Sequence, residues 1–310
     1  MDLNSQTVDA PVAVPLICVC CGTSLAGTLK CDNCSHAYAK NPFGYVEMLK
    51  EPWDHVSAPD DYVEAQEHTG LRVFQEYLLP LFSEGAARSV LDVGCGMGQG
   101  IRQMGVSGAD AYGIDLPCYS RAWEKNGLDP AQFMCADACA LPFPDNFFDV
   151  VYSLGVIEHI GTVLGHCTLR PDYWEKRQAY ASEILRVTKD GGRIVIACPN
   201  KTFPVDVQHG PTDALSPKVP LRSLICEKTG LNFHKTWGEH HLLSYAETQQ
   251  LFRAGRSFRA LPLKGYFGFG KFERGWLKPF ASLAKWYVDS MPEWLRRSAM
   301  NPYMLAQIVK

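Results

Sequence analysis

Long apolar runs are missing from this chain of 310 residues. No stretch of 18 consecutive apolar residues occurs, so we expect no membrane-spanning helix. Residues 1–17 have no basic start followed by a long apolar core, so we also expect no signal peptide and a cytoplasmic location. Internal repeats and low-complexity tracts are absent too. The 46% of hydrophobic residues suffices for one large domain, or for one large domain plus a small module.

A strong net charge is also missing, since the formal net charge is −3. The charges are unevenly distributed along the chain, however. Residues 251–310 contain eleven Lys and Arg against three Asp and Glu, a net charge of +8, so the first 250 residues have a net charge of −11. This asymmetry in charge bears on the kind of partner that the protein binds.

The twelve cysteines are many for a reducing compartment, where clustered cysteines bind metal more often than they form disulfides. Cys18 and Cys21 form one C-x-x-C pair, and Cys31 and Cys34 form a second pair nine residues later. This spacing predicts two facing knuckles that hold a structural zinc ion in a tetrahedral site. Cys20 is a spare thiol that can replace Cys18 or Cys21 as a ligand. Because so short a segment has little core, the metal would supply its folding energy.

The composition divides the chain into three parts. Residues 1–50 are predicted to form the zinc-ribbon module, and residues 51–61, rich in prolines and acids, form a linker. Residues 62–310 form the large domain, which opens with a helix over about 62–82.

Apolar runs and helical patterns alternate in the large domain. We expect strands at 89–93, 111–117, 132–138, 147–155 and 191–200, a helix at 172–188, a capping box from Ser244 to Glu247 that opens a helix, and two final strands at 259–263 and 303–309. Such alternation predicts an α/β fold with a doubly wound, mostly parallel seven-stranded sheet. Sheets of this kind bind ligands at the carboxyl ends of their strands.

A glycine-rich loop follows the first strand of this sheet. Residues 90–100 read V-L-D-V-G-C-G-M-G-Q-G, with Asp92 two residues before the first glycine. Glycines let the backbone approach a ligand closely. Asp115 and Asp137 end the next two strands, at the same edge of the sheet. The nicotinamide fingerprint G-x-G-x-x-G is an alternative, but it fits the glycine spacing less well.

These motifs resemble those of class I S-adenosylmethionine-dependent methyltransferases over about residues 85–200, including the run LPFPDNFFDVVYSLGVIEHI at 141–160. The resemblance implies S-adenosylmethionine as the cofactor, with Asp115 on both ribose hydroxyls and Asp137 on the adenine amino group. A carboxylate can accept both hydrogen bonds of a cis-diol. Ordinary turn roles for Asp92 and Asp115 are the alternative. The implied cofactor-binding set is Asp92, Gly94, Cys95, Gly96, Gly98, Asp115, Leu116, Asp137, Ala138, Ser153 and Leu154.

Methyl transfer is an in-line displacement that depends mainly on alignment, and a base helps when the acceptor is a hydroxyl or a protonated amine. His159, after the fourth strand, is either such a base or a histidine that packs against a helix. Glu158 would orient it or face the cofactor, and His166 is a weaker candidate on a loop. The remaining candidates, His209 and His241, lie in the insertion at 199–243, where Asp206 can act together with His209.

A catalytic metal is disfavoured by the sequence. His240 and His241 are adjacent and would point apart on a strand. The resembled family also mostly needs no metal.

The absence of one sequence motif narrows the range of methyl acceptors. Ser153–Val156 stand where some methyltransferases have N-P-P-Tyr or N-P-P-Phe, which counts against exocyclic base amines and glutamine amides. Hydroxyl, carbon, ring-nitrogen and amine acceptors remain open. The basic aromatic segment at 264–300 is interpreted as a helix packed on the sheet with a solvated basic edge. A membrane-surface face, a pocket for a lipid-linked acceptor and an RNA contact are the alternatives.

The leading functional hypothesis is therefore a methyltransferase that acts on a small molecule, such as a natural product, glycan or lipid-linked intermediate. An rRNA guanine methyltransferase that uses the ribbon for RNA is an alternative, but the acidic N-terminal portion weighs against a nucleic-acid partner. A non-catalytic cofactor-binding scaffold is the third hypothesis. The sequence predicts no oligomeric state.

Overall fold

The computed structural model describes residues 14–25, 27–52, 79–80, 88–106, 108–163, 168–206, 208–209, 220–229, 231–263 and 278–310. Its strands are β1 (Ala39–Lys40), β2 (Val46–Met48), β3 (Ser89–Val93), β4 (Asp110–Asp115), β5 (Phe133–Ala136), β6 (Phe148–Leu154), β7 (Thr188–Pro199), β8 (Val205–Asp206), β9 (Asn232–Phe233), β10 (Ser257–Ala260) and β11 (Tyr303–Val309). Its helices are α3 (Gln99–Val106), the 3-10 turn η2 (Pro117–Tyr119), α4 (Ser120–Lys125), α5 (Tyr173–Val187), α6 (Pro220–Thr229), α7 (Tyr245–Leu251), α8 (Lys278–Ser290) and α9 (Glu293–Arg296).

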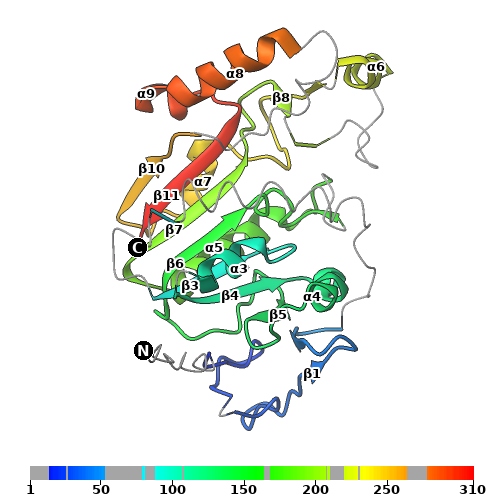
Figure 1. Cartoon of the computed structure of the whole chain (residues 1–310), viewed down its shortest axis with the longest axis vertical. Helices are drawn as coiled ribbons and strands as arrows, with labels where there is room; N and C mark the ends of the chain where they lie inside the picture. The colour runs from blue at the N-terminus through cyan, green and yellow to red at the C-terminus, as the bar shows by residue number, and fades with distance from the viewer. Residues whose placement is uncertain are drawn as a thin grey trace, which may run out of the picture.

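One large mixed sheet organises the described part of the chain (Figure 1). Its strand order is β1-β2-β5-β4-β3-β6-β7-β11-β10. The strands from β2 to β7 run parallel, whereas β11 and β10 are antiparallel at one end and β1 is antiparallel at the other. The chain order reverses direction at β3, and doubly wound sheets have their ligand crevice at such a point, here outside the carboxyl ends of β3, β4 and β6.

Helices cover both faces of this sheet, because consecutive strand residues are buried on opposite sides. Leu91 of β3 belongs to a core cluster that includes Ile184 of α5, with α7 on the same side. Its neighbour Val90 belongs to a second cluster that includes Ile101 of α3 and Trp123 of α4. The central strands are thus buried on both faces, which explains their nearly continuous apolar sequences.

The N-terminal segment extends the sheet. β2 pairs in parallel with β5, and β1 adds beside β2. Cys18, Leu25 and Tyr38 lie in the same core cluster as the sheet residues, and the Tyr45 hydroxyl donates to the Leu128 carbonyl at 2.9 Å. The four-cysteine segment therefore packs at the β5 edge, at the bottom of Figure 1.

The predicted architecture is confirmed. The five parallel strands and the two final strands form seven neighbouring strands of the sheet, and β1 and β2 bring the total in this sheet to nine. The helix predicted at 172–188 is α5. The predicted capping box is present, since the Ser244 hydroxyl accepts from the backbone of Glu247 and the Glu247 carboxylate accepts from the backbone of Ser244. Most of the predicted linker and of the helix at 62–82 lie outside the described residues, and the predicted domain boundaries stay a prediction.

The C-terminal helices differ from the interpretation of a helix packed on the sheet. α8 buries Val288, but it exposes Phe280, Leu283 and Trp286 by 50%, 59% and 65%. Pro292 separates α8 from α9 and stands at the N-cap of α9, where its missing N–H costs nothing. Residues 264–277 lie outside the described part. None of the helices in the part of the chain covered by the structure has the length and apolarity needed to span a bilayer.

Candidate active site

The glycine loop joins β3 to α3 at the crevice. Gly94, Gly96 and Gly98 all have positive φ, at 82°, 49° and 72°. A Cβ on Gly98 would lie 2.5 Å from the Phe133 ring, and one on Gly94 would lie 2.3 Å from Val156. Both the conformation and the close packing therefore require glycine here.

Asp115 fixes the shape of this loop. Its carboxylate accepts from the backbone N–H groups of Gly96 and Leu116, both at 2.7 Å. The Trp123 indole donates to the Gly96 carbonyl at 2.6 Å, from the other side of the loop. Burial raises the pKa of Asp115 to about 6, although the two backbone bonds oppose this shift. A carboxylate offers about four acceptor sites, so Asp115 retains acceptor capacity at the crevice.

Asp92 lies buried below the loop in β3. Burial raises the pKa of Asp92 to about 8, the neighbouring Tyr152 hydroxyl opposes this shift, and the charge of Asp115 adds to it. Burial and the Asp92 charge raise the pKa of Tyr152 as well. A cation in the crevice would favour the ionised form of Asp92 and offset part of the cost of burying it.

The other predicted cofactor-binding residues fall at the same edge but have different environments. Asp137 is exposed after β5, and its carboxylate accepts from the Cys139 backbone at 2.8 Å. The Ser153 hydroxyl is buried and donates to the Val93 carbonyl at 2.7 Å, so it joins β6 to β3. Cys95 is buried, and Leu116, Ala138 and Leu154 are half-buried.

The histidines come together beyond the end of β6. Asp206, in β8, is 1% exposed at its side chain and lies 3.0 Å from Nδ1 of His209. The Nε2 atom of His209 lies 3.4 Å from Nε2 of His159, fifty residues earlier in the chain. The predicted pairing of Asp206 with His209 is thus present in the geometry. His159 lies in a series of turns after β6 and not in a helix.

The prediction that His240 and His241 point apart is wrong. Their rings stack, with centroids 4.4 Å apart and an interplanar angle of 30°, because residues 240–241 lie in a bend region and not in a strand. His241 also approaches Asp206, with Nε2 at 3.7 Å from the carboxylate. Burial would raise the pKa of Asp206, but the hydrogen bond from His209 and the proximity of His241 outweigh it and hold that pKa far below the ordinary value.

Glu158 is fully buried beside these histidines. Neither of its carboxylate oxygens has a hydrogen-bond partner in the described structure. Burial raises the pKa of Glu158 to about 7, whereas His209 and Arg177 oppose this shift.

Arg177 of α5 is a residue that the sequence did not suggest. Its guanidinium is buried and donates to the backbone carbonyls of Ile160 and His241. It therefore connects the turns that contain His159 to the bend that contains His241. No local motif surrounds Arg177, and the only signal in the sequence was its position on the predicted buried face of an amphipathic helix. Tyr152 beside Asp92 was missed for the same reason. His166 lies outside the described residues.

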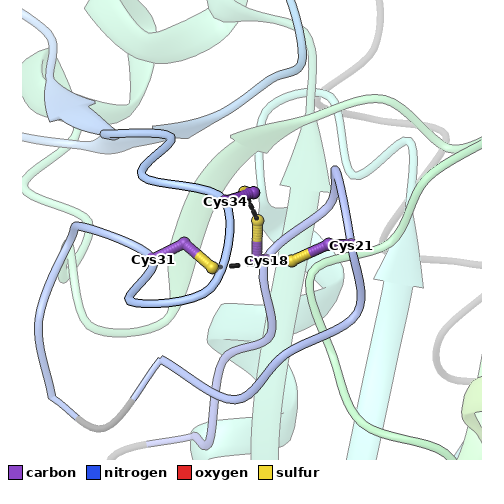
Figure 2. A group of neighbouring side chains, drawn as sticks. All are labelled: Cys18, Cys21, Cys31 and Cys34. Atoms are coloured by element: carbon purple, nitrogen blue, oxygen red, sulfur yellow. Dashed lines mark hydrogen bonds between the residues drawn. The ribbon is translucent and has the colours of Figure 1, made fainter.

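The four predicted zinc ligands also lie together, with the pair Cys18 and Cys21 facing the pair Cys31 and Cys34 (Figure 2). The Sγ atoms of Cys18 and Cys34 are 3.5 Å apart, and so are those of Cys21 and Cys31. All four sulfurs lie within 4.8 Å of one another. Thiolates at 2.3 Å from a tetrahedral zinc ion are about 3.8 Å apart, so the residues fit such an ion. Cys20 is exposed and is not a member of this group.

The fold is a doubly wound α/β domain whose glycine loop lies at the carboxyl edge of the parallel strands. Residues 91–196 match the family of methyltransferase domains. This match covers about a third of the chain and agrees with what the motifs indicated.

Individual relatives agree with this assignment. The probable chloroplastic tocopherol O-methyltransferase of Oryza sativa subsp. japonica is 36% identical over 137 residues, which cover 41% of this chain and 34% of that protein. The 27-O-demethylrifamycin SV methyltransferase of Amycolatopsis mediterranei is 30% identical over 165 residues, covering 49% of this chain and 54% of that protein. The chain thus spans between about a third and about a half of these curated relatives.

Solved structures are more distant. Phosphoethanolamine N-methyltransferase 2 of Haemonchus contortus, in complex with S-adenosyl-L-methionine, is 16% identical with a TM-score of 0.38, covering 72% of this chain and 48% of that one.

Proposed function

We propose that this protein transfers a methyl group from S-adenosylmethionine to a small-molecule acceptor at the carboxyl edge of its sheet. The observation that carries the proposal is the loop from Gly94 to Gly98, bonded to Asp115 at the end of the neighbouring strand within the segment that matches methyltransferase domains.

The cofactor would lie across the ends of β3, β4 and β5. Its amino-acid moiety would contact the loop, and its cationic groups would offset the burial of Asp92. Asp115 would accept from the ribose hydroxyls with the lone pairs that Gly96 and Leu116 leave open. Asp137 is exposed beyond β5 and available for the adenine amino group. Cys95, Leu116, Ala138 and Leu154 would line the cavity, whereas the bond of Ser153 to Val93 supports a structural role for that hydroxyl.

The acceptor would enter beside the histidines. Glu158 and His159 follow β6, whose end borders the loop through the contact of Val156 with Gly94. His209, oriented by Asp206, lies against His159. This set of two buried acids and two half-buried imidazoles is where an acceptor hydroxyl or amine would lose its proton.

The named substrates of the relatives support a small-molecule acceptor. The rice relative is named for a tocopherol and the Amycolatopsis relative for a rifamycin.

The exposed apolar side chains of α8, among them Leu283 and Trp286, also support an apolar acceptor that is reached near a membrane surface. Vesicle co-sedimentation of the wild type and of Leu283→Ser would test that part separately.

We further propose that Cys18, Cys21, Cys31 and Cys34 hold a structural zinc ion. Their sulfur spacing supports it. Replacing Cys31 with Ser should lower the zinc content of the purified protein by one ion per chain and unfold the N-terminal segment, whereas Cys20→Ser should retain both that ion and the folded segment. Full zinc content in Cys31→Ser would contradict the assignment.

Calorimetry tests the central proposal. Titration of the folded protein with S-adenosylmethionine and with S-adenosylhomocysteine should give saturable binding to one site. Incubation of labelled cofactor with a panel of prenylated phenols and polyketides should then yield S-adenosylhomocysteine in proportion to the methylated product. Absence of binding heat with both nucleosides at several temperatures would overturn the proposal.

A further inference from the structure

The cluster beyond β6 contains three side chains whose donor atoms converge. One carboxylate oxygen of Glu158 and one ring nitrogen each of His159 and His209 all lie within 4.8 Å of one another. Glu158 is buried, and the two histidines are half-buried. They come from two segments of the chain about fifty residues apart, so local sequence does not force them together.

The separation of the two imidazoles fits two ligands of one ion. Their Nε2 atoms are 3.4 Å apart. Nitrogens that each lie about 2.0–2.1 Å from a tetrahedral zinc ion are about 3.3–3.4 Å from one another. A hydrogen bond between the rings is the alternative explanation of this distance, and it predicts no metal.

Glu158 supplies an independent observation. Its side chain is 0% exposed, and both of its oxygens lack a hydrogen-bond partner among the described residues. A buried carboxylate without a partner is costly, and such groups in native proteins are usually paired or coordinate a metal. Arg177 and His209 lie close enough to affect its charge, but neither donates a hydrogen bond to it in the structure.

Asp206 orients His209 in the way that metal sites use. Its carboxylate lies 3.0 Å from Nδ1 of His209, so the ring donates its Nδ1 proton to Asp206 and directs the Nε2 lone pair toward His159. Ligating histidines nearly always bond their second nitrogen to such an outer partner. Asn232 also donates to the His209 backbone carbonyl at 2.8 Å, which holds the segment in place.

We propose that Glu158, His159 and His209 bind a divalent transition-metal ion such as Zn²⁺, with Asp206 as the residue that positions His209. Two imidazoles and one carboxylate suit zinc, iron or manganese, and three protein ligands leave a coordination position open, as catalytic sites do. Metal binding does not depend on the proposed methyl transfer. The role of the ion rests on that function: at the edge next to the glycine loop, it would bind an acceptor oxygen and lower its pKa.

Zinc content tests this site apart from activity. Wild-type protein, equilibrated with Zn²⁺ and gel-filtered, should hold one more zinc per chain than Glu158→Gln, His159→Ala or His209→Ala treated in the same way. The difference is unaffected by the four cysteines, which all variants share. His234→Ala is the matched control, because His234 lies beside His240 outside the three-residue group, and it should retain the wild-type content.

Cobalt gives a second readout. Co²⁺ at this site should add d–d absorption without the thiolate charge-transfer bands of the cysteine site, and Glu158→Gln should abolish only that addition. Asp206→Asn should weaken Zn²⁺ binding at this site by about 10–100-fold. Equal zinc content in the wild type and in three folded ligand variants, verified by circular dichroism, would overturn the site and leave the hydrogen-bonded pair as the explanation. Cofactor binding in calorimetry would be unaffected by that outcome.

Discussion

The proposed cofactor site and the proposed acceptor site, called here the cofactor side and the acceptor side, are built by different means. On the cofactor side, backbone atoms determine the geometry: glycines with positive φ form the loop, and Asp115 holds it through main-chain N–H groups. On the acceptor side, side chains determine the geometry, since Asp206, His209 and His159 meet through imidazole contacts.

This difference fits two separate tasks: binding a cofactor that many enzymes share, and binding an acceptor that is particular to one enzyme. A loop built from backbone atoms would recognise groups that every cofactor molecule presents, and its tight packing leaves little room for substitutions. A side-chain cluster on an insertion can be rebuilt for another acceptor without disturbing the sheet. Changes on the cofactor side should therefore affect stability and cofactor affinity, whereas changes on the acceptor side should spare the cofactor.

The largest effect is expected at Asp92 as the pH rises. Its folded pKa of about 8 exceeds the unfolded value of 3.8, so its contribution to stability is complete below about pH 4 and is lost as the pH rises through 8. The wild type should therefore lose about 4 kcal/mol of unfolding free energy between pH 4 and pH 8 because of Asp92. Asp92→Asn has no carboxyl group at this position and should not show that loss. Urea unfolding at both pH values measures this, with the exposed Asp110→Asn as the control. Parallel pH profiles for wild type and Asp92→Asn would contradict it.

Gly98→Ala should destabilise the cofactor side next most. The new methyl group would lie 2.5 Å from the Phe133 ring, and the alanine would have to keep the φ of 72° that Gly98 has. The free energy of unfolding should therefore fall by about 3 kcal/mol. Gly108 has a similar φ of 76° but nothing within 4 Å of a Cβ, which makes Gly108→Ala the matched control for the strain alone. If the two variants lose equal stability in thermal or urea unfolding, the tight packing of the loop is not what requires glycine.

Arg177→Met should loosen the acceptor side alone. It leaves the buried carbonyls of Ile160 and His241 without a donor, while it removes a buried charge, so we expect a loss of about 2 kcal/mol in unfolding free energy. Hydrogen exchange should accelerate at residues 156–162 and 239–243, and the affinity for S-adenosylhomocysteine should be unchanged. Arg170→Met, at an exposed ion pair with Asp172, provides the control. A loss of cofactor affinity in Arg177→Met would show that the two sides are coupled.

The same contrast explains what the sequence could predict. Gly94 to Gly98, Asp115 and the four cysteines stand out by their spacing along the sequence, because they lie in short segments or at the ends of neighbouring strands. The contact of His209 with His159 depends on how an insertion folds back over β6, which no local pattern encodes. The stacking of His240 on His241 was missed because the prediction placed the pair on a strand, where adjacent side chains point to opposite faces. Exposure of Phe280 and Leu283 was missed because helical periodicity predicts which face is apolar, and not whether another element covers it.

The smallest effect decides what Asp115 does. Asp115→Ala should weaken binding of S-adenosylhomocysteine by at least about tenfold, about 1.4 kcal/mol, but part of that loss can come from the loop, because Gly96 loses its acceptor. A cycle with the 2′-deoxyribose analogue of the same ligand separates the two roles. Wild type should bind the analogue more weakly than the parent nucleoside, whereas Asp115→Ala should bind both equally. Asp110→Ala, at the amino end of the same strand, should discriminate as the wild type does. Equal discrimination by Asp115→Ala would assign the carboxylate to the loop alone, and the cofactor side would then be built entirely from main-chain geometry.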